Sequence, residues 1–434
     1  MARIHAQPKT VNHEPYHQES PTFPDHGMRS GSFEWKLLLA ATAAEPEESK
    51  LSRLDSLLKA QRGSKVDWQR LLCCADFHGT SSLLHQNLAR YSDVVPRYVL
   101  EALKERYVTN VQKSLFLARE LTRILDCAQT LNIDLISYKG IVLSEVYYGD
   151  MAIRQAGDID LFVRKRDVVR AKNALRELGY LPELRIPENA EADYLASGYE
   201  YSFDGGAGKH LLELQWALQP HYYAVDYDMD GLFGCAVEVH AAGLGLKIPS
   251  PEDLLIVLCI HAAKHAWGRI IWLCDVGQVL KRSKLNFDSI LSRARELGIT
   301  RILHLTLLLA NRFIGMPLPG EIERAISADG AAHALYEELA PLIAAGVAWE
   351  DHKMSYFRLM MRLRERGRDQ IRFLSRLTLT PGPGEWQTVN LPRALFPLYK
   401  VVRMARLAGR FSVYTSRHGS CRRAPPSPMG GGLN

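Results

Sequence analysis

Two aspartates separated by one apolar residue are the feature that most constrains the fold of this chain. The run Gly157-Asp158-Ile159-Asp160-Leu161-Phe162-Val163 is otherwise apolar and ends in a β-branched residue, which is typical of a strand. Alternation along a strand places both carboxylates on one face. Two carboxylates that close repel each other, so they either stay in water or bind a hard divalent cation, and Mg²⁺ is the usual ion where phosphate shares the site.

A glycine turn precedes the aspartate strand. Residues 135–138 form a short apolar run, Lys139 and Gly140 follow, and residues 141–148 carry apolar side chains at helical spacing. Gly140 is therefore predicted at a strand-to-helix turn, where free backbone N–H groups bind phosphate. Arg154, four residues before the first aspartate, is expected to reach the same anion.

Two further strands are predicted after an amphipathic helix over residues 166–179. Residues 209–216 read as a strand in which Glu213 is a candidate third carboxylate, and residues 199–204 alternate as a strand before it. Gly-rich residues 205–208 between them lack the Lys and Ser or Thr of a phosphate-binding P-loop. A hairpin turn is the preferred interpretation of this segment.

The order of these elements resembles the polymerase-β-type nucleotidyltransferase superfamily, and within it a family of uncharacterised bacterial nucleotidyltransferases. The resemblance covers roughly residues 35–410. The superfamily usually has Gly-Gly or Gly-Ser at the turn, whereas this chain has Gly140-Ile141. The matching motifs are Lys139-Gly140, Arg154 with Asp158-Ile159-Asp160-Leu161, Glu213-Leu214-Gln215-Trp216, Ser250-Pro251-Glu252-Asp253-Leu254, residues 261–267 with Trp272 and Asp275, Leu391-Pro392, and Tyr399.

The resemblance implies an α+β fold, in which a nucleotidyltransferase-type core with a small mixed sheet is flanked by N- and C-terminal helical domains. We expect four or five strands, with the three carboxylates at one edge of the sheet. By resemblance, Asp158, Asp160 and Glu213 hold Mg²⁺ or Mn²⁺ and are the catalytic residues. Lys139, Gly140 and Arg154 would bind the phosphates of a nucleoside triphosphate (NTP).

A histidine pair lies on a predicted helix over residues 254–267. His261 and His265 stand four residues apart on one face, but Ala262 occupies the place of the Glu that a zinc protease needs, which excludes that class. Such a pair also occurs in packed cores and among hydrogen-bonding groups that line a site. The resemblance implies instead that this helix faces the nucleotide, so that Lys264 or His265 contacts phosphate or substrate.

The composition, 47% apolar and 24% charged over 434 residues, is that of a globular protein with more than one domain. The sequence has no run of eighteen apolar residues and no signal-peptide core, so a cytoplasmic location is expected. Seven cysteines without a C-x-x-C motif fit a reducing compartment. We divide the chain into a disordered tail (1–32), a helical N-terminal domain (33–126), a nucleotidyltransferase core (127–227), a helical C-terminal domain with a basic end (228–415) and a flexible tail (416–434).

The C-terminal part of the chain is strongly basic. Residues 352–423 contain sixteen Lys and Arg but three acids, which predicts an anionic partner. Residues 399–407 are basic and amphipathic in the manner of a helix at a membrane surface, although a solvated helix face fits equally well. No zinc finger or helix-turn-helix motif is present, so nucleic acid is not an expected partner.

The sequence therefore predicts an enzyme that moves a nucleoside monophosphate from an NTP such as ATP to a hydroxyl group of a small molecule or protein, with Mg²⁺ or Mn²⁺. The alternative is a catalytically inactive nucleotide-binding or scaffold protein on the same fold. Three carboxylates kept beside Arg154 favour the enzyme, because an inactive site has no physical reason to keep uncompensated acids together.

Overall fold

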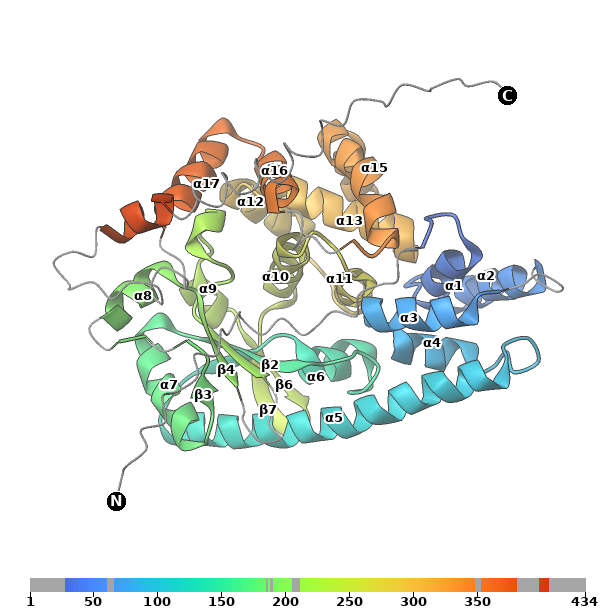
Figure 1. Cartoon of the computed structure of the whole chain (residues 1–434), viewed down its shortest axis with the longest axis horizontal. Helices are drawn as coiled ribbons and strands as arrows, with labels where there is room; N and C mark the ends of the chain where they lie inside the picture. The colour runs from blue at the N-terminus through green and yellow to red at the C-terminus, as the bar shows by residue number, and fades with distance from the viewer. Residues whose placement is uncertain are drawn as a thin grey trace, which may run out of the picture.

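A seven-stranded mixed sheet forms the centre of the computed structural model, and helices cover it (Figure 1). The structure describes residues 28–60, 66–184, 186–187, 190–204, 211–347, 353–380 and 398–405. The strand order is β3-β4-β5-β2-β1-β7-β6. The expected α+β class with helical flanks is confirmed. The strands are β1 Leu135–Ser137, β2 Asp158–Val163, β3 Leu181–Pro182, β4 Glu200–Asp204, β5 Leu211–Gln215, β6 Val237–Ala241 and β7 Leu244–Ile248.

The sheet is larger than the four or five strands expected, because a hairpin of β6 and β7 extends it beside β1. Sequence analysis ended the core at residue 227, before this hairpin. Both turn residues, Ala242 and Gly243, have positive φ (56° and 76°). Turns of this kind are usually Asn-Gly or Asp-Gly, so an alanine in the first position weakens the sequence signal.

The aspartate strand β2 lies in the middle of the sheet, not at an edge as expected. It pairs in parallel with β5 and antiparallel with β1. Ile159 and Leu161 are 4% and 0% exposed, so the face of β2 opposite the aspartates is buried. The predicted hairpin of β4 and β5 is confirmed as an antiparallel pair, and its Gly-rich turn lies outside the described residues.

One long helix, α5 (Arg97–Thr130), connects the N-terminal helices with the sheet and runs along it in Figure 1. Two of its side chains bind the loop before β2: Asn110 Nδ2 donates to the Ala152 carbonyl at 2.6 Å, and Ser114 Oγ donates to the Met151 carbonyl at 3.1 Å. This helix crosses the expected domain boundary at residues 126 and 127. The other N-terminal helices are α1 Phe33–Ala41, α2 Glu47–Ala60, α3 Trp68–His78 and α4 Ser81–Leu88.

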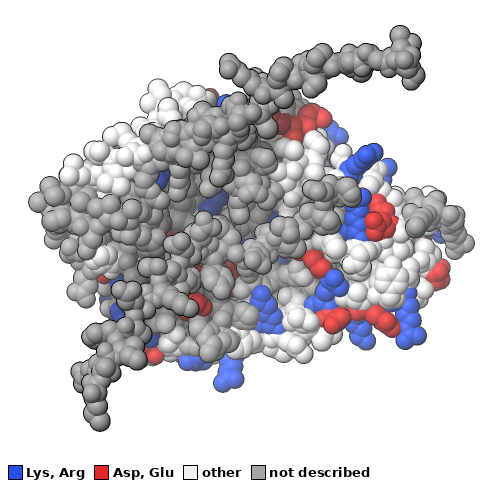
Figure 2. Space-filling view, in the orientation of Figure 1, with Lys and Arg blue, Asp and Glu red and all other residues white. Residues whose placement is uncertain are grey.

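Ordered structure begins before residue 33, where we expected the first helix to follow a tail. Met28 is 2% exposed within the core, and the Ser32 side chain accepts a hydrogen bond from the Trp35 N–H at 3.2 Å as the N-cap of α1. Residues 1–27 lie outside the described residues. Around the described N-terminal helices, Lys and Arg side chains lie beside Asp and Glu side chains on the face shown in Figure 2.

Ser250 caps the N-terminus of α10 (Pro251–Lys264). Ser250 Oγ accepts a hydrogen bond from the Asp253 N–H at 3.2 Å, and Pro251 is the first helical residue. No helix of the described chain has the length and apolar character needed to cross a membrane. The remaining helices are α6 Gly140–Leu143, which continues as a π-helical turn over Ser144–Tyr148, α7 Val168–Glu177, α8 Glu191–Ser197, α9 Met229–Gly234, α11 Ile270–Arg282, α12 Phe287–Leu297, α13 Thr300–Ile314, α14 Gly320–Ser327, α15 Gly330–Ala344, α16 Lys353–Arg362 and α17 Gly367–Leu379.

The turn between β1 and α6 depends on a glycine. Gly140 has φ of 61°, and a Cβ atom there would lie 3.2 Å from the Asp158 carbonyl oxygen. We expect Gly140→Ala to lower the free energy of unfolding by about 1–2 kcal/mol, because an L-residue is strained in the left-handed region. Chemical denaturation would measure the loss. Gly330→Ala is the control, since Gly330 has open space around it at the start of α15. Equal stability of the two variants would contradict this account of the turn.

Candidate active site

Three carboxylates meet on one face of the central strands. Asp158 and Asp160 alternate along β2, and the parallel register pairs Asp160 with Glu213 of β5. Adjacent strands lie about 4.7–4.9 Å apart, so Glu213 is an immediate neighbour of the aspartate pair. A fourth carboxylate, Glu200 of β4, extends the same face, because its register partner is Gln215, two residues after Glu213. Sequence analysis did not identify Glu200.

A glutamine side chain connects Glu213 with Glu200. The Gln215 amide nitrogen donates to Glu213 Oε2 at 2.7 Å and lies 3.4 Å from Glu200 Oε2. The Tyr138 hydroxyl donates to the Gln215 amide oxygen at 2.8 Å, which sets the direction of the amide. Tyr138 in turn stacks on Phe162 of β2, with ring centroids 4.0 Å apart. Packing and hydrogen bonds therefore orient the third carboxylate.

A lysine ammonium is held against the aspartate pair. Lys139 Nζ lies 2.7 Å from Asp160 Oδ1, and both side chains are more than nine-tenths buried. Burial alone would lower the pKa of Lys139, but the attraction of Asp160 raises it well above the usual value. Lys139 is the N-cap residue of α6, so the glycine turn delivers this cation to the carboxylates.

Asp158, Glu213 and Glu200 hold their protons more strongly than carboxyl groups do in water, because their pKa values are raised. Burial, followed by repulsion from Asp160, raises the pKa of Asp158 to about 6. Burial, followed by repulsion from Glu200 and Asp160, raises the pKa of Glu213 well above its usual value. Burial also raises the pKa of Glu200. The site therefore concentrates negative charge that a cation would stabilise.

Arg154 forms an ion pair with Asp275 of α11, which follows the core in the sequence. Its Nε lies 2.9 and 3.0 Å from the two oxygens of Asp275 on α11, and Tyr148 donates its hydroxyl to the same carboxylate at 2.8 Å. Both members of the ion pair are more than nine-tenths buried. Sequence analysis treated Arg154 as a direct phosphate ligand, whereas here its Nε is engaged by Asp275.

The end of α10 lies over the acidic face of β4. Lys264 Nζ is 3.1 Å from the Tyr199 hydroxyl and 4.7 Å from the centroid of the Tyr199 ring, and Tyr199 donates to Glu200. His265 is exposed and follows the last helical residue. Its ring packs near those of His261 and Trp272, with centroids 4.8 and 5.1 Å away. Lys264 therefore reaches the acidic cluster through Tyr199.

Lys113 of α5 is, after Glu200, a second residue of the site to which sequence analysis gave no role. It lies on the helical face of Asn110 and Ser114, which bind the loop before β2. Its side chain is partly buried; burial lowers its pKa, and attraction to Asp158 opposes that shift. The signal in the sequence was the shared face with Asn110 at i and i+3, on a helix that precedes β1.

The donor set fits a hard divalent cation in its chemistry. Carboxylate oxygens are the ligands that Mg²⁺ and Mn²⁺ accept in phosphate-transfer sites, and Asp158, Asp160 and Glu213 present them from neighbouring positions. Among the described residues, no three His, Cys, Asp or Glu side chains are already arranged around one ion position. Lys139 contacts Asp160 through Oδ1, so an ion at this carboxylate would either share it with the ammonium or displace the ammonium.

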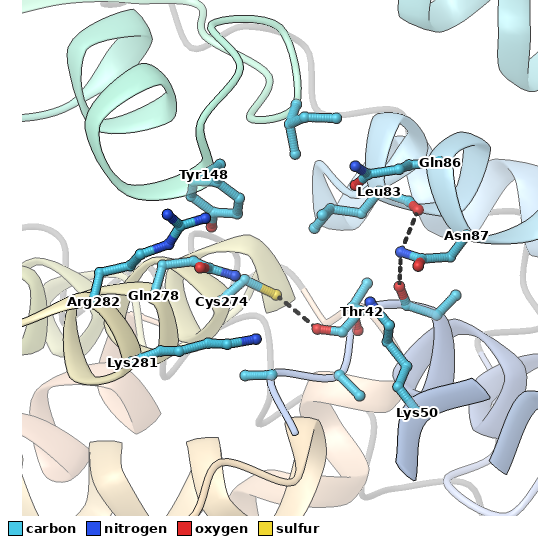
Figure 3. Close-up of a pocket in the computed structure, with 14 residues that line it drawn as sticks. Thr42, Lys50, Leu83, Gln86, Asn87, Tyr148, Cys274, Gln278, Lys281 and Arg282 are labelled. Atoms are coloured by element: carbon cyan, nitrogen blue, oxygen red, sulfur yellow. Dashed lines mark hydrogen bonds between the residues drawn. The ribbon is translucent and has the colours of Figure 1, made fainter. Parts of the chain in front are cut away.

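A separate small cavity lies between α4, α11 and the segment that joins α1 to α2 (Figure 3). Its volume is about 110 Å³, and none of the residues that sequence analysis assigned to the site lines it. Liquid water occupies about 30 Å³ per molecule, so this space holds a few waters and is too small for a nucleotide. Tyr148 lines this cavity and also binds Asp275.

The comparison with known families identifies most of the chain. A family model described as "Uncharacterised nucleotidyltransferase" matches residues 64–315, which is more than half of the sequence. No curated protein matches the chain. The matched segment contains every carboxylate and cation of the site described above.

Two solved structures of ANT(2″)-Ia are among those that match. The crystal structure in complex with adenylyl-2″-tobramycin is 16% identical and covers 42% of this chain and 96% of that chain, with a TM-score of 0.31. The solution structure of this antibiotic-resistance factor is 15% identical and covers 46% and 94%, with a TM-score of 0.28. At these scores neither likeness bears on the activity of this chain.

We expect the burial of Asp158, together with repulsion from Asp160, to appear as a pH-dependent loss of stability. The folded-state pKa of about 6 exceeds the unfolded value of about 3.9, so folding binds a proton between these values. The wild-type chain should lose stability as the pH rises from about 4 to about 6, relative to Asp158→Asn, which carries no charge there. Unfolding free energies of both proteins, measured in EDTA across this range, test the prediction. A constant difference between the two proteins across this range would contradict it.

Proposed function

Because this chain belongs to the family of uncharacterised nucleotidyltransferases, we propose that it transfers a nucleoside monophosphate from an NTP to a hydroxyl group with the help of divalent metal ions. The observation that carries the proposal is the register of β2 and β5, which sets Glu213 beside the Asp158 and Asp160 pair. The resulting acidic face suits a reaction in which a hydroxyl is deprotonated and a pyrophosphate leaves.

Asp158, Asp160 and Glu213 would hold the ions. Bound Mg²⁺ or Mn²⁺ would supply activation of the acceptor hydroxyl and neutralisation of the charge on the leaving pyrophosphate. Glu213 is our candidate to accept the proton of the acceptor hydroxyl, since the register places its carboxylate beside the Asp158 and Asp160 pair. Gln215 would keep the Glu213 carboxylate directed through its 2.7 Å hydrogen bond.

The cations of the site would bind the triphosphate. We propose that Lys139 pairs with Asp160 in the free protein and turns to phosphate oxygen when the NTP and its ions arrive. The backbone N–H groups at Gly140 and the ammonium of Lys113 would add donors on the same side of β2. Arg154, whose Nε is bound to Asp275, would contribute its charge to the local field rather than a direct contact.

The acceptor would lie on the other side of Glu213, toward β4 and the end of α10. Lys264 and His265 would form this wall of the site, with Tyr199 and Glu200 opposite them. These side chains offer both charge signs and two aromatic rings at the boundary between the core and the C-terminal helices. Small-molecule sites commonly form at such boundaries.

A catalytically inactive nucleotide-binding or scaffold protein is the second candidate. The ion pair of Lys139 and Asp160 favours it, because a lysine can neutralise an acidic cluster permanently in place of a metal. The two candidates differ in one measurable property. The enzyme releases pyrophosphate and labels an acceptor, whereas the scaffold binds nucleotide without turnover.

The deciding experiment is to incubate the purified chain with each α-labelled NTP, Mg²⁺ or Mn²⁺ and fractions of host extract. We expect label in an acceptor only with metal present, and a loss of at least about a hundredfold in Asp158→Asn and Glu213→Gln, because several kcal/mol of charge stabilisation disappears. Asp193→Asn, on α8, is the matched control. NTP binding without transfer in any fraction would favour the scaffold, and neither binding nor transfer would contradict both candidates.

Lys113 gives a second prediction. Replacing it by Ala should weaken NTP binding about 10- to 150-fold, the value of one charge-assisted contact of about 1.5–3 kcal/mol, while Lys113→Arg should keep most of the affinity. Isothermal titration with Mg²⁺-NTP would measure it. Lys104→Ala, exposed on the same helix, should bind like the wild type. If Lys113→Ala binds nucleotide normally but melts earlier, the side chain only packs α5 against β2.

A further inference from the structure

The C-terminal helix α17 is apolar on two opposite sides. One side packs into the protein through Phe373, which is 0% exposed. The other side presents Ile371, 71% exposed, and Leu374, 52% exposed, at i and i+3 on one helical stripe. Burial of Phe373 stabilises α17 against the rest of the protein. Exposure of Ile371 and Leu374 to water contributes nothing to the stability of this helix.

A second exposed stripe lies on the helical segment 398–405. Leu398, Val401 and Met404 are 45%, 53% and 46% exposed at intervals of three residues, while Tyr399 is 2% exposed on the opposite side. The segment packs at the end of α17, where Arg403 Nε donates to the Leu377 carbonyl at 3.1 Å. Together with Leu379, these two short elements supply six of the twelve exposed large apolar side chains of the described chain.

Exposed cationic side chains lie next to the two stripes. Arg368, with 73% of its side chain exposed, lies one turn before Ile371, and Lys400 is exposed beside Val401. From residue 386 to the end, the sequence contains eight Lys and Arg and no acid. Figure 1 places α17 at the upper left. In the same region of Figure 2, the atoms that are not grey are mainly white, that is, neither Lys or Arg nor Asp or Glu.

We infer that α17 and residues 398–405 form a docking surface for an anionic lipid membrane. Aliphatic side chains would enter the boundary between headgroups and acyl chains, and the neighbouring cations would meet acidic headgroups. Each Lys or Arg near such a surface adds attraction that salt weakens. All six exposed apolar residues of these two elements are aliphatic, which suits contact with lipid acyl chains. A nucleic-acid site would instead combine cations with exposed aromatic rings on which bases stack.

The test is sedimentation of the full-length protein with vesicles of phosphatidylcholine alone or mixed with phosphatidylserine, at about 0.1 M salt, where screening is moderate. We expect binding to the acidic vesicles, at least about tenfold weaker binding to the neutral ones, and release at high salt. Absence of binding to acidic vesicles, or equal binding to both kinds, would overturn the inference.

Variants assign the contact to the two stripes. Ile371→Asp with Leu374→Asp should reduce binding to acidic vesicles at least about tenfold, and Val401→Asp with Met404→Asp should do the same if the first pair fails to fold. Leu115→Asp, 56% exposed on α5, is the control that should bind normally. A double variant that keeps the wild-type melting temperature and still binds would overturn the assignment. Binding to RNA in place of vesicles, or a dimer that the variants dissociate, would overturn it in favour of those partners.

Discussion

Repulsion among carboxylates on one sheet face is the constraint on which the rest of the site depends. Asp158, Asp160, Glu213 and Glu200 lie on three neighbouring strands, and the register places them next to one another on one face of the sheet. Burial makes this repulsion more costly, because fewer water molecules screen the charges. The protein therefore keeps cations and directed donors at the edge of the cluster, of which the ammonium of Lys139 is the nearest.

The groups that stabilise this cluster come from distant parts of the sequence. Arg154 joins the loop before β2 to Asp275 on α11, 121 residues later, and Lys264 reaches β4 from the end of α10. Removing one partner of a buried ion pair typically lowers the free energy of unfolding by about 3–5 kcal/mol. The Arg154 and Asp275 pair therefore also holds the core against the C-terminal helices. The contacts of Arg154 and Lys264 thus serve two purposes: they place positive charge near the acidic cluster, and they hold the C-terminal helices against the sheet.

Local patterns were sufficient to predict part of this arrangement. Alternation identified the Asp158 strand and the Glu213 strand, the glycine identified the turn, and the motifs identified the family that the family match then confirmed. Pairings between distant segments were not predictable, because no local pattern encodes register: the β6 and β7 hairpin and the partner of Arg154 belong to this class. Gln215 is an intermediate case, since its position two residues after Glu213 places it on the same face of β5.

Helix α5 has a consequence for how the length of this chain can change. Arg106 Nε binds Asp76 of α3 at 2.7 and 2.9 Å, and Asn110, one turn later, binds the loop before β2. Each residue of an α-helix turns the next by about 100° and advances it by about 1.5 Å. One inserted or deleted residue between these two contacts would rotate one partner away from its neighbour. Helix α5 therefore fixes the spacing between the N-terminal helices and the aspartate strand. We expect related chains to vary in length in the loops on either side of α5 rather than within it.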